Sequence, residues 1–151
     1  MTPTRKKSKR RSAANSTAAE RLRSATFYLD QSIYSKVLLE RMRAAGATVE
    51  HAGSAFRSST EDHVWLKGCG ERGWIALTRD ERIRRRRIEI EALRDHGLAA
   101  FCFTAGNATA EDTATVILPL IPKMANMSIS EQKPFLYTFG LSGRPSAVKL
   151  R

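Results

Sequence analysis

The sequence of 151 residues lacks a long apolar run and has few cysteines, and each absence excludes a class of protein. It contains no stretch of the ~18 consecutive apolar residues that a membrane-spanning helix needs, and no apolar segment follows the basic residues 1–11. Membrane spanning and ordinary secretion are therefore not expected. The two cysteines, Cys69 and Cys102, lie far apart without CxxC spacing, so neither a zinc site nor a disulfide framework is supported. We expect reduced, structural cysteines and a cytoplasmic protein.

Acidic residues are also scarce, because 15 Asp and Glu face 26 Lys and Arg and leave a net charge of +11. Such an excess indicates a polyanionic partner such as nucleic acid. Residues 1–24 are basic and almost free of bulky apolar side chains, so they are expected to form a disordered tail. Two interpretations of this tail remain open: an arm that contacts nucleic acid phosphates or resembles a nuclear signal, and a merely solvated start of the chain.

From residue 25 onward, short apolar runs alternate with amphipathic segments. Strands are expected at 26–29, 47–51, 74–78, 99–104 and 134–139, and helical patterns at 33–46, 58–73, 80–96 and 109–124. The second helix would begin at a capping box formed by Ser58 and Glu61, and the last would be bent or shortened by Pro119 and Pro122. Connections this short imply right-handed crossovers. The prediction is a three-layer α/β/α domain at 25–140 around a mostly parallel sheet, followed by a C-terminal tail at 141–151.

Acidic side chains recur where the expected strands end. Asp30 follows the first strand and Asp80 the third, while Glu61 and Asp62 open the helix after the second. In a parallel sheet these positions share the carboxyl edge, where open α/β folds place their sites. Clustered carboxylates need a cation, and Mg²⁺ or Mn²⁺ prefers oxygen ligands and can activate water for phosphodiester hydrolysis.

A structural alternative stays open for some of these acids. Glu61 and the pair Glu111 and Asp112, which open the helix after the fourth strand, occupy first helical turns. Asp and Glu are favoured there simply because they cap backbone amides and complement the helix dipole. This explanation applies less well to Asp30 and Asp80, which end strands.

Four motifs in this order resemble the PIN-like domain of VapC-type toxins. They are Phe27-Tyr28-Leu29-Asp30, the segment 60–66 (TEDHVWL), the segment 73–86 (GWIALTRD followed by ERIRRR) and the segment 103–107 (FTAGN). The resemblance covers about residues 26–140, and the joint order of the motifs carries it. It implies a PIN-like fold and an Mg²⁺- or Mn²⁺-dependent ribonuclease, commonly the toxin that its antitoxin partner holds inactive.

By position, the resemblance implies that Asp30, Asp62 and Asp80 are the catalytic and metal-binding acids, with Glu61 as a neighbouring catalytic candidate. It also implies that Thr104 and Asn107 line the site and contact substrate.

The chain departs from the family pattern after the fourth strand. There it has Thr104-Ala105-Gly106-Asn107 where a further acid is expected. Glu111 or Asp112 could substitute from the next helix; otherwise metal affinity would be weaker or activity lost. His63 adjoins Asp62 and is a weaker candidate for orienting the substrate.

The arginine run beside Asp80 is a candidate RNA-binding surface. Arg82, Arg84, Arg85 and Arg86, with Arg87, could hold an RNA backbone, each phosphate contact adding ~0.7 to 0.9 to the salt dependence of binding. The alternatives are a solvated helix face balanced by glutamates and a surface for an antitoxin.

Two other functions are weighed against the nuclease. One is a non-catalytic nucleic-acid-binding module of PIN-like fold, in which the acids only cap helices. The other is a receiver-like phosphoacceptor domain, which is disfavoured because the chain lacks a paired acidic motif after the first strand and the required Lys after a later one. The RNA target, the antitoxin and the formation of a homodimer are not determined by the sequence.

Overall fold

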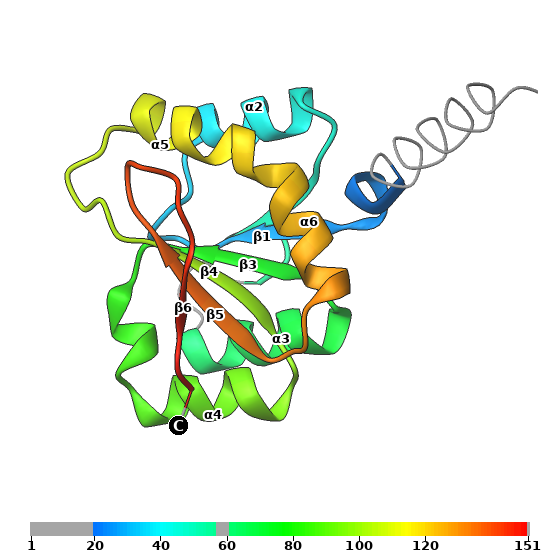
Figure 1. Cartoon of the computed structure of the whole chain (residues 1–151), viewed down its shortest axis with the longest axis vertical. Helices are drawn as coiled ribbons and strands as arrows, with labels where there is room; N and C mark the ends of the chain where they lie inside the picture. Colours follow the sequence, from blue (N-terminus) through cyan, green and yellow to red (C-terminus); the bar gives the residue numbers. More distant parts are fainter. Residues whose placement is uncertain (1–19, 57–60, 151) are drawn as a thin grey trace, which may run out of the picture.

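A six-stranded sheet forms the middle layer of the computed structural model, which describes residues 20–56 and 61–150 (Figure 1). Its strands lie in the order β2-β1-β3-β4-β5-β6. They are β1 (Thr26–Leu29), β2 (Thr48–His51), β3 (Ile75–Thr78), β4 (Ala99–Phe103), β5 (Phe135–Phe139) and β6 (Ser146–Val148). The first five strands pair in parallel, and β6 runs antiparallel to β5. The predicted mostly parallel sheet is confirmed.

Helices cover both faces of this sheet, as the three-layer prediction required (Figure 1). The helices α2 (Lys36–Ala44), α5 (Ala110–Ile117) and α6 (Ile121–Ser130) lie on one face, and α3 (Asp62–Arg72) and α4 (Arg87–Asp95) on the other. The domain also contains two 3₁₀ helices, η1 (Glu81–Arg84) and η2 (Leu118–Leu120). Within the described ranges no helix has the length and apolarity to cross a membrane.

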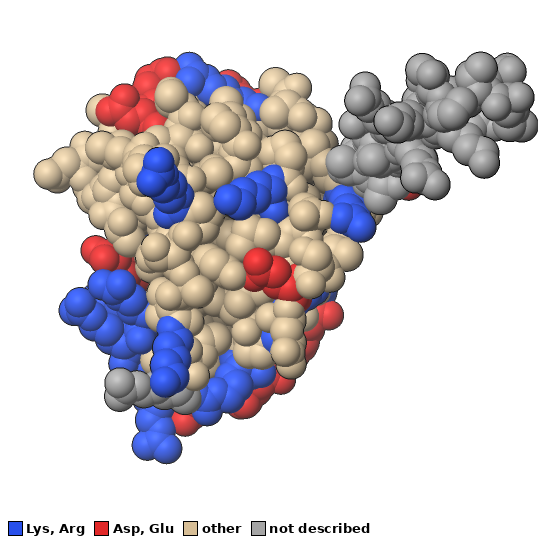
Figure 2. Space-filling model, viewed as in Figure 1, with Lys and Arg blue, Asp and Glu red and all other residues tan. Residues whose placement is uncertain are grey.

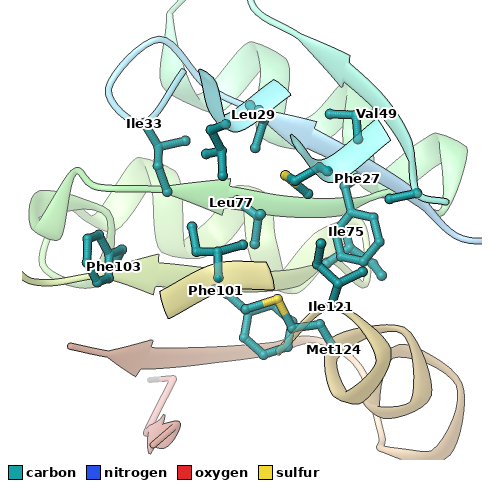
Figure 3. Close-up of a cluster of buried hydrophobic side chains, with 14 of the residues drawn as sticks. Phe27, Leu29, Ile33, Val49, Ile75, Leu77, Phe101, Phe103, Ile121 and Met124 are labelled. Atoms are coloured by element: carbon teal, nitrogen blue, oxygen red, sulfur yellow. The ribbon is translucent and has the colours of Figure 1, made fainter. Parts of the chain in front are cut away.

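The core is divided by the sheet into two clusters because side chains alternate along each strand. On β1, Phe27 and Leu29 pack toward α2, α5 and α6, whereas Tyr28 packs with Trp65 of α3 on the other face. Phe101 and the other members of the first cluster fill the space between strands and helices (Figure 3). Both cysteines are buried and free, and burial raises the pKa of Cys102 to about 12. This arrangement fixes the strand ends that carry the acids.

The helix expected from 80 to 96 is divided into η1 and α4. Asp80 caps η1, since its side chain accepts a hydrogen bond from the backbone N–H of Arg82. Arg86 then has extended backbone angles before α4 begins at Arg87. The predicted effect of the prolines is confirmed, because Pro119 lies in η2 and Pro122 in the first turn of α6.

Both expected domain boundaries differ from the structure. Residues 20–24, placed in the N-terminal tail, are helical, and Leu22 packs against the core; residues 1–19 lie outside the described part. Residues 141–150, placed in the C-terminal tail, contain β6, whose Val148 pairs with Leu136 and packs against the second core cluster. Backbone pairing with β5 therefore extends the domain beyond residue 140. Ser58 of the expected capping box is outside the described residues, and Glu61 caps α3 without a side-chain hydrogen bond.

Gly70 allows α3 to approach the end of α4. A Cβ at this position would lie 2.6 Å from Cβ and 2.7 Å from the carbonyl oxygen of His96. Gly70→Ala is expected to lower the free energy of unfolding by about 1–3 kcal/mol, because the backbone of His96 must shift. Urea denaturation measures this, with Gly106→Ala as the control, since nothing lies within 4 Å of a Cβ there. Equal stability of the two variants would contradict this explanation of the helix contact.

Candidate active site

Asp30 is a buried carboxylate at the carboxyl end of β1, with 3% of its surface exposed. Its Oδ2 accepts a hydrogen bond of 2.6 Å from the hydroxyl of Thr78 on β3, and its Oδ1 accepts one of 2.8 Å from the backbone N–H of Ser32. The Ser32 hydroxyl also donates to Oδ1. Burial raises the pKa of Asp30, the bonds from Ser32 and Thr78 oppose that rise, and the nearby charge of Asp62 adds to it. Hydrogen bonds thus hold Asp30 in a fixed position, and no Lys, Arg or His among residues 20–56 and 61–150 forms an ion pair with it.

Asp80 follows β3 and is held by Arg82. The Arg82 Nε lies 2.9 Å from Oδ1 and its Nη2 3.0 Å from Oδ2, while its backbone N–H also donates to Oδ1. These bonds lower the pKa of Asp80. Both carboxylate oxygens are therefore occupied by one guanidinium group, in addition to the capping role described above.

Asp62 begins α3 and lines a pocket of about 370 Å³ between α3 and α4. Its Oδ1 accepts a hydrogen bond of 2.9 Å from the indole Nε1 of Trp65, so this core residue also orients an acid of the site. Glu61 and His63 line the same pocket, with 3.4 Å between Oε2 and Nδ1. Arg86, Ile88 and Glu89 complete the lining of this pocket, so acidic groups border most of it and one guanidinium lies among them.

The three predicted acids share one region, but they are not arranged as a closed metal site. Asp62 is near enough for its charge to act on both Asp30 and Arg82. In residues 20–56 and 61–150, no three Asp, Glu, His or Cys side chains converge closely enough to hold a metal ion. The donors are oxygens, which fits the chemistry of Mg²⁺ or Mn²⁺. At Asp80, the guanidinium of Arg82 occupies the place that a cation would take.

Two acids at the start of α5 were considered as substitutes for an acid after β4. Glu111 forms an ion pair with Arg41 of α2, and the backbone N–H of Asp112 donates 3.0 Å to the capping hydroxyl of Thr109. Asp112 is exposed. Both acids lie in the first turn of α5, but Thr109 and not an acid provides its side-chain cap. Because Glu111 pairs with Arg41, it does not complete the site in this arrangement.

Thr104 and Asn107 lie in the loop after β4, at the same edge of the sheet. The hydroxyl of Thr104 donates to the carbonyl of Phe139 at 3.3 Å, and Asn107 is exposed beside Asp112 in a separate pocket. Their contact with substrate stays a prediction.

Most members of the arginine run have acidic partners. Arg84 pairs with Glu81, Arg86 with Glu89 and Arg87 with Glu91, and of the run only Arg85 has no such partner among the described residues. Lys and Arg side chains gather over η1 and the beginning of α4, at the lower left of Figure 2. The pairs of Arg84 and Arg87 involve exposed glutamates and contribute at most about 1 kcal/mol each, so phosphates can replace Glu81 and Glu91; the partner of Arg86, Glu89, is buried.

Four functional or supporting residues were not anticipated: Ser32, Thr78, Arg79 and Glu89. The hydroxyls hold Asp30, and the Arg79 guanidinium donates to the carbonyls of Ala105 and Gly106 at 2.8 and 2.7 Å, which fixes the loop after β4. A hydroxyl residue two positions after the acid and another at the end of the neighbouring strand are signals that could have identified Ser32 and Thr78.

The PIN-like domain family matches residues 25–105 of this chain, a span that contains all three central acids. The chain belongs to the PIN-like domain family. Glu111 and Asp112 lie outside the matched span. The resemblance of the four motifs is thereby confirmed.

One relative, named as a VapC ribonuclease, is similar over most of this chain. The chain is 29% identical over 115 residues to "Putative ribonuclease VapC45" of Mycobacterium tuberculosis, in an alignment that covers 74% of this chain and 83% of the relative. No solved structure gives a significant match. The recognised VapC-type relationship therefore rests on the family match and on this relative.

Proposed function

We propose that this PIN-like protein is an Mg²⁺- or Mn²⁺-dependent ribonuclease that hydrolyses RNA phosphodiester bonds, as the toxin of a VapBC-type toxin–antitoxin pair. The observation that carries the proposal is the buried Asp30 carboxylate, held by hydroxyl groups and close to a second acid, Asp62. Burying a carboxylate without a basic partner costs free energy, and catalytic sites are where such groups cluster. The name of the VapC relative supports the reaction and the partner.

In this proposal Asp30, Asp62 and Asp80 hold the cation, with Glu61 at the margin of the site. When bound, the cation would polarise the phosphate and supply a nucleophilic water. Ser32 and Thr78 keep the Asp30 oxygens in a fixed orientation, and Trp65 does the same for Asp62.

In the proposed nuclease, the arginine run after Asp80 holds the RNA substrate. Arg82, Arg84, Arg85 and Arg86 bind the RNA backbone, because they follow Asp80 directly and are mostly solvent-facing. Thr104 and Asn107 contribute at the loop after β4. An antitoxin would cover the carboxyl edge of the sheet, where the acids and the arginine run lie. The protein could act in this way as a monomer or as a homodimer.

One specific observation favours a second function, a non-catalytic nucleic-acid-binding module. Asp80 caps η1 and is bound by Arg82, as expected of an acid with a structural role. In that case RNA binds through arginines alone, and Asp30→Asn and Asp80→Asn leave the affinity for RNA unchanged or raised.

A cleavage assay on a mixed pool of structured and single-stranded RNA distinguishes the two functions. The wild type is incubated with Mn²⁺, with Mg²⁺ or with a chelator, beside Asp30→Ala and Asp80→Ala. The nuclease predicts cleavage that needs the metal and both acids. RNA binding without cleavage under every metal condition would overturn it in favour of the module.

Arg82 competes with a cation for Asp80, because it occupies both carboxylate oxygens. Arg82→Gln is therefore expected to strengthen Mn²⁺ binding by about two- to fivefold, the range expected from breaking an exposed ion pair. Isothermal titration with Mn²⁺ measures this. Arg84→Gln is the matched control, since it removes the same charge from η1 but pairs with Glu81 instead. Equal Mn²⁺ affinities of the two variants would show that Arg82 does not compete.

A further inference from the structure

Glu89 is a buried carboxylate in the first turn of α4, with 2% of its surface exposed. Its Oε1 lies 3.3 Å from Nη1 of Arg86. Its Oε2 is buried and has no hydrogen-bond partner among the described residues. Buried polar atoms are almost always paired, and a charged oxygen without a partner is especially costly. This oxygen needs an explanation that the fold does not supply.

The ion pair with Arg86 accounts for Oε1 of Glu89 but not for Oε2. The Arg86 side chain is 46% exposed and approaches Oε1 alone. A residue needed only as a partner for a half-exposed arginine could equally be exposed, as Glu91 is in its pair with Arg87 on the same helix. The burial of Glu89 toward α3 therefore indicates a second interaction.

The position of Glu89 relates it to the acids of the site. Glu89 and Asp62 line the same pocket between α3 and α4. The charges of both also act on the guanidinium of Arg82, which in turn binds Asp80. Three carboxylates from separate parts of the chain therefore act on one positive group, which only Asp80 contacts directly.

We propose that Glu89 is a further acidic ligand of this site, sharing a divalent cation with Asp62. The inference rests on the proposed metal dependence, and it adds an acid from α4 that neither the motifs nor the strand ends indicate. In the metal-free protein, Arg86 and Arg82 offset part of the negative charge of Glu89. A bound cation would give Oε2 of Glu89 a partner and would also be coordinated by Asp62.

Mn²⁺ titration of Glu89→Gln tests the proposal, with Glu91→Gln as the matched control on the same helix. Glu89→Gln is expected to weaken Mn²⁺ binding by about tenfold or more, the scale seen when groups around a metal are removed, while Glu91→Gln stays within twofold of the wild type. Thermal unfolding without metal provides a second readout. If Glu89 served only Arg86, Glu89→Gln would lower the unfolding temperature and leave the affinity for Mn²⁺ unchanged.

The outcomes separate this inference from the proposed function. Unchanged Mn²⁺ affinity in Glu89→Gln, with tight binding by the wild type, overturns the role of Glu89 and leaves the nuclease intact. Failure of the wild type to bind Mn²⁺ overturns both. If Glu89→Gln does not fold, NMR of the wild type tests the proposal instead. Mn²⁺ is then expected to broaden the side-chain carboxyl signal of Glu89 at a lower concentration than that of Glu91. The reverse order would contradict the proposal.

Discussion

Asp30→Asn is expected to reduce metal-dependent RNA cleavage by about a hundredfold or more and to raise the thermal stability of the metal-free protein at neutral pH. Cleavage falls because the substitution removes a negative charge that the cation needs. Stability rises because burial raises the pKa of Asp30, so its ionised form is unfavourable in the folded state. An amide of the same shape retains an oxygen that can accept the Ser32 N–H bond.

The pH dependence of this effect has a definite sign. The folded-state pKa of Asp30 lies above the unfolded one, so the wild type loses stability as pH rises through the folded-state pKa. The amide in the Asp30→Asn variant cannot titrate, so the variant shows no such loss. The stability difference between variant and wild type is therefore fully developed above the folded-state pKa and disappears as the solution is acidified below the unfolded one.

Thermal unfolding from acid to neutral pH, with chelator present, measures the difference, and the RNA assay measures cleavage. Asp95→Asn is the control, because Asp95 is an exposed residue at the end of α4. A variant that is inactive and also less stable than the wild type at neutral pH would mean that Asp30 holds the fold together. A stable variant that still cleaves RNA would remove Asp30 from the reaction.

The triple variant Arg84→Gln, Arg85→Gln and Arg87→Gln is expected to bind single-stranded RNA about a hundredfold more weakly near 0.1 M salt. Each phosphate contact contributes about 0.7 to the slope of log affinity against log salt, so three contacts contribute about 2. This contribution vanishes near 1 M salt and amounts to about two logarithmic units at 0.1 M. Fluorescence anisotropy at several salt concentrations measures both the affinity and the slope.

The control for this prediction removes three exposed charges from elsewhere in the domain, Lys36, Lys123 and Lys133. Two of them lie on α2 and α6, on the face of the sheet opposite α4 (Figure 1). A change of net charge alone would weaken binding equally in both triple variants. Only a local RNA surface over η1 and α4 gives the arginine variant the smaller salt slope.

The sequence was sufficient for the five parallel strands and for the placement of Asp30 and Asp80, because two of those strands are short apolar runs that stop on these acids. It was not sufficient for the segment after β3. A single helix was expected over residues 80–96, with its glutamates on a solvated face, yet in the structure Ile88 is 53% exposed and Glu89 is buried. The cause is the 3₁₀ turn capped by Asp80, which makes α4 begin at Arg87 and rotates Glu89 to face the pocket.

The partners of the acids were equally beyond a reading of the sequence. The sequence does not indicate that the guanidinium of Arg82, a predicted RNA contact, binds Asp80 two residues earlier. Thr78 reaches Asp30 across 48 positions of the chain, through the parallel pairing of β1 with β3. Contacts of this kind depend on strand register and local turns, which composition and spacing do not specify.

The central claim is that these acids bind a divalent cation, and crystals grown with Mn²⁺ test it most directly. Data collected at the manganese absorption edge locate the ion independently of any assumed ligand. The account predicts an anomalous peak bordered by Asp30, Asp62 and Asp80, with the Arg82 guanidinium displaced from Asp80. A saturating Mn²⁺ concentration that gives no peak at this edge of the sheet, with the pair of Arg82 and Asp80 intact, would contradict it.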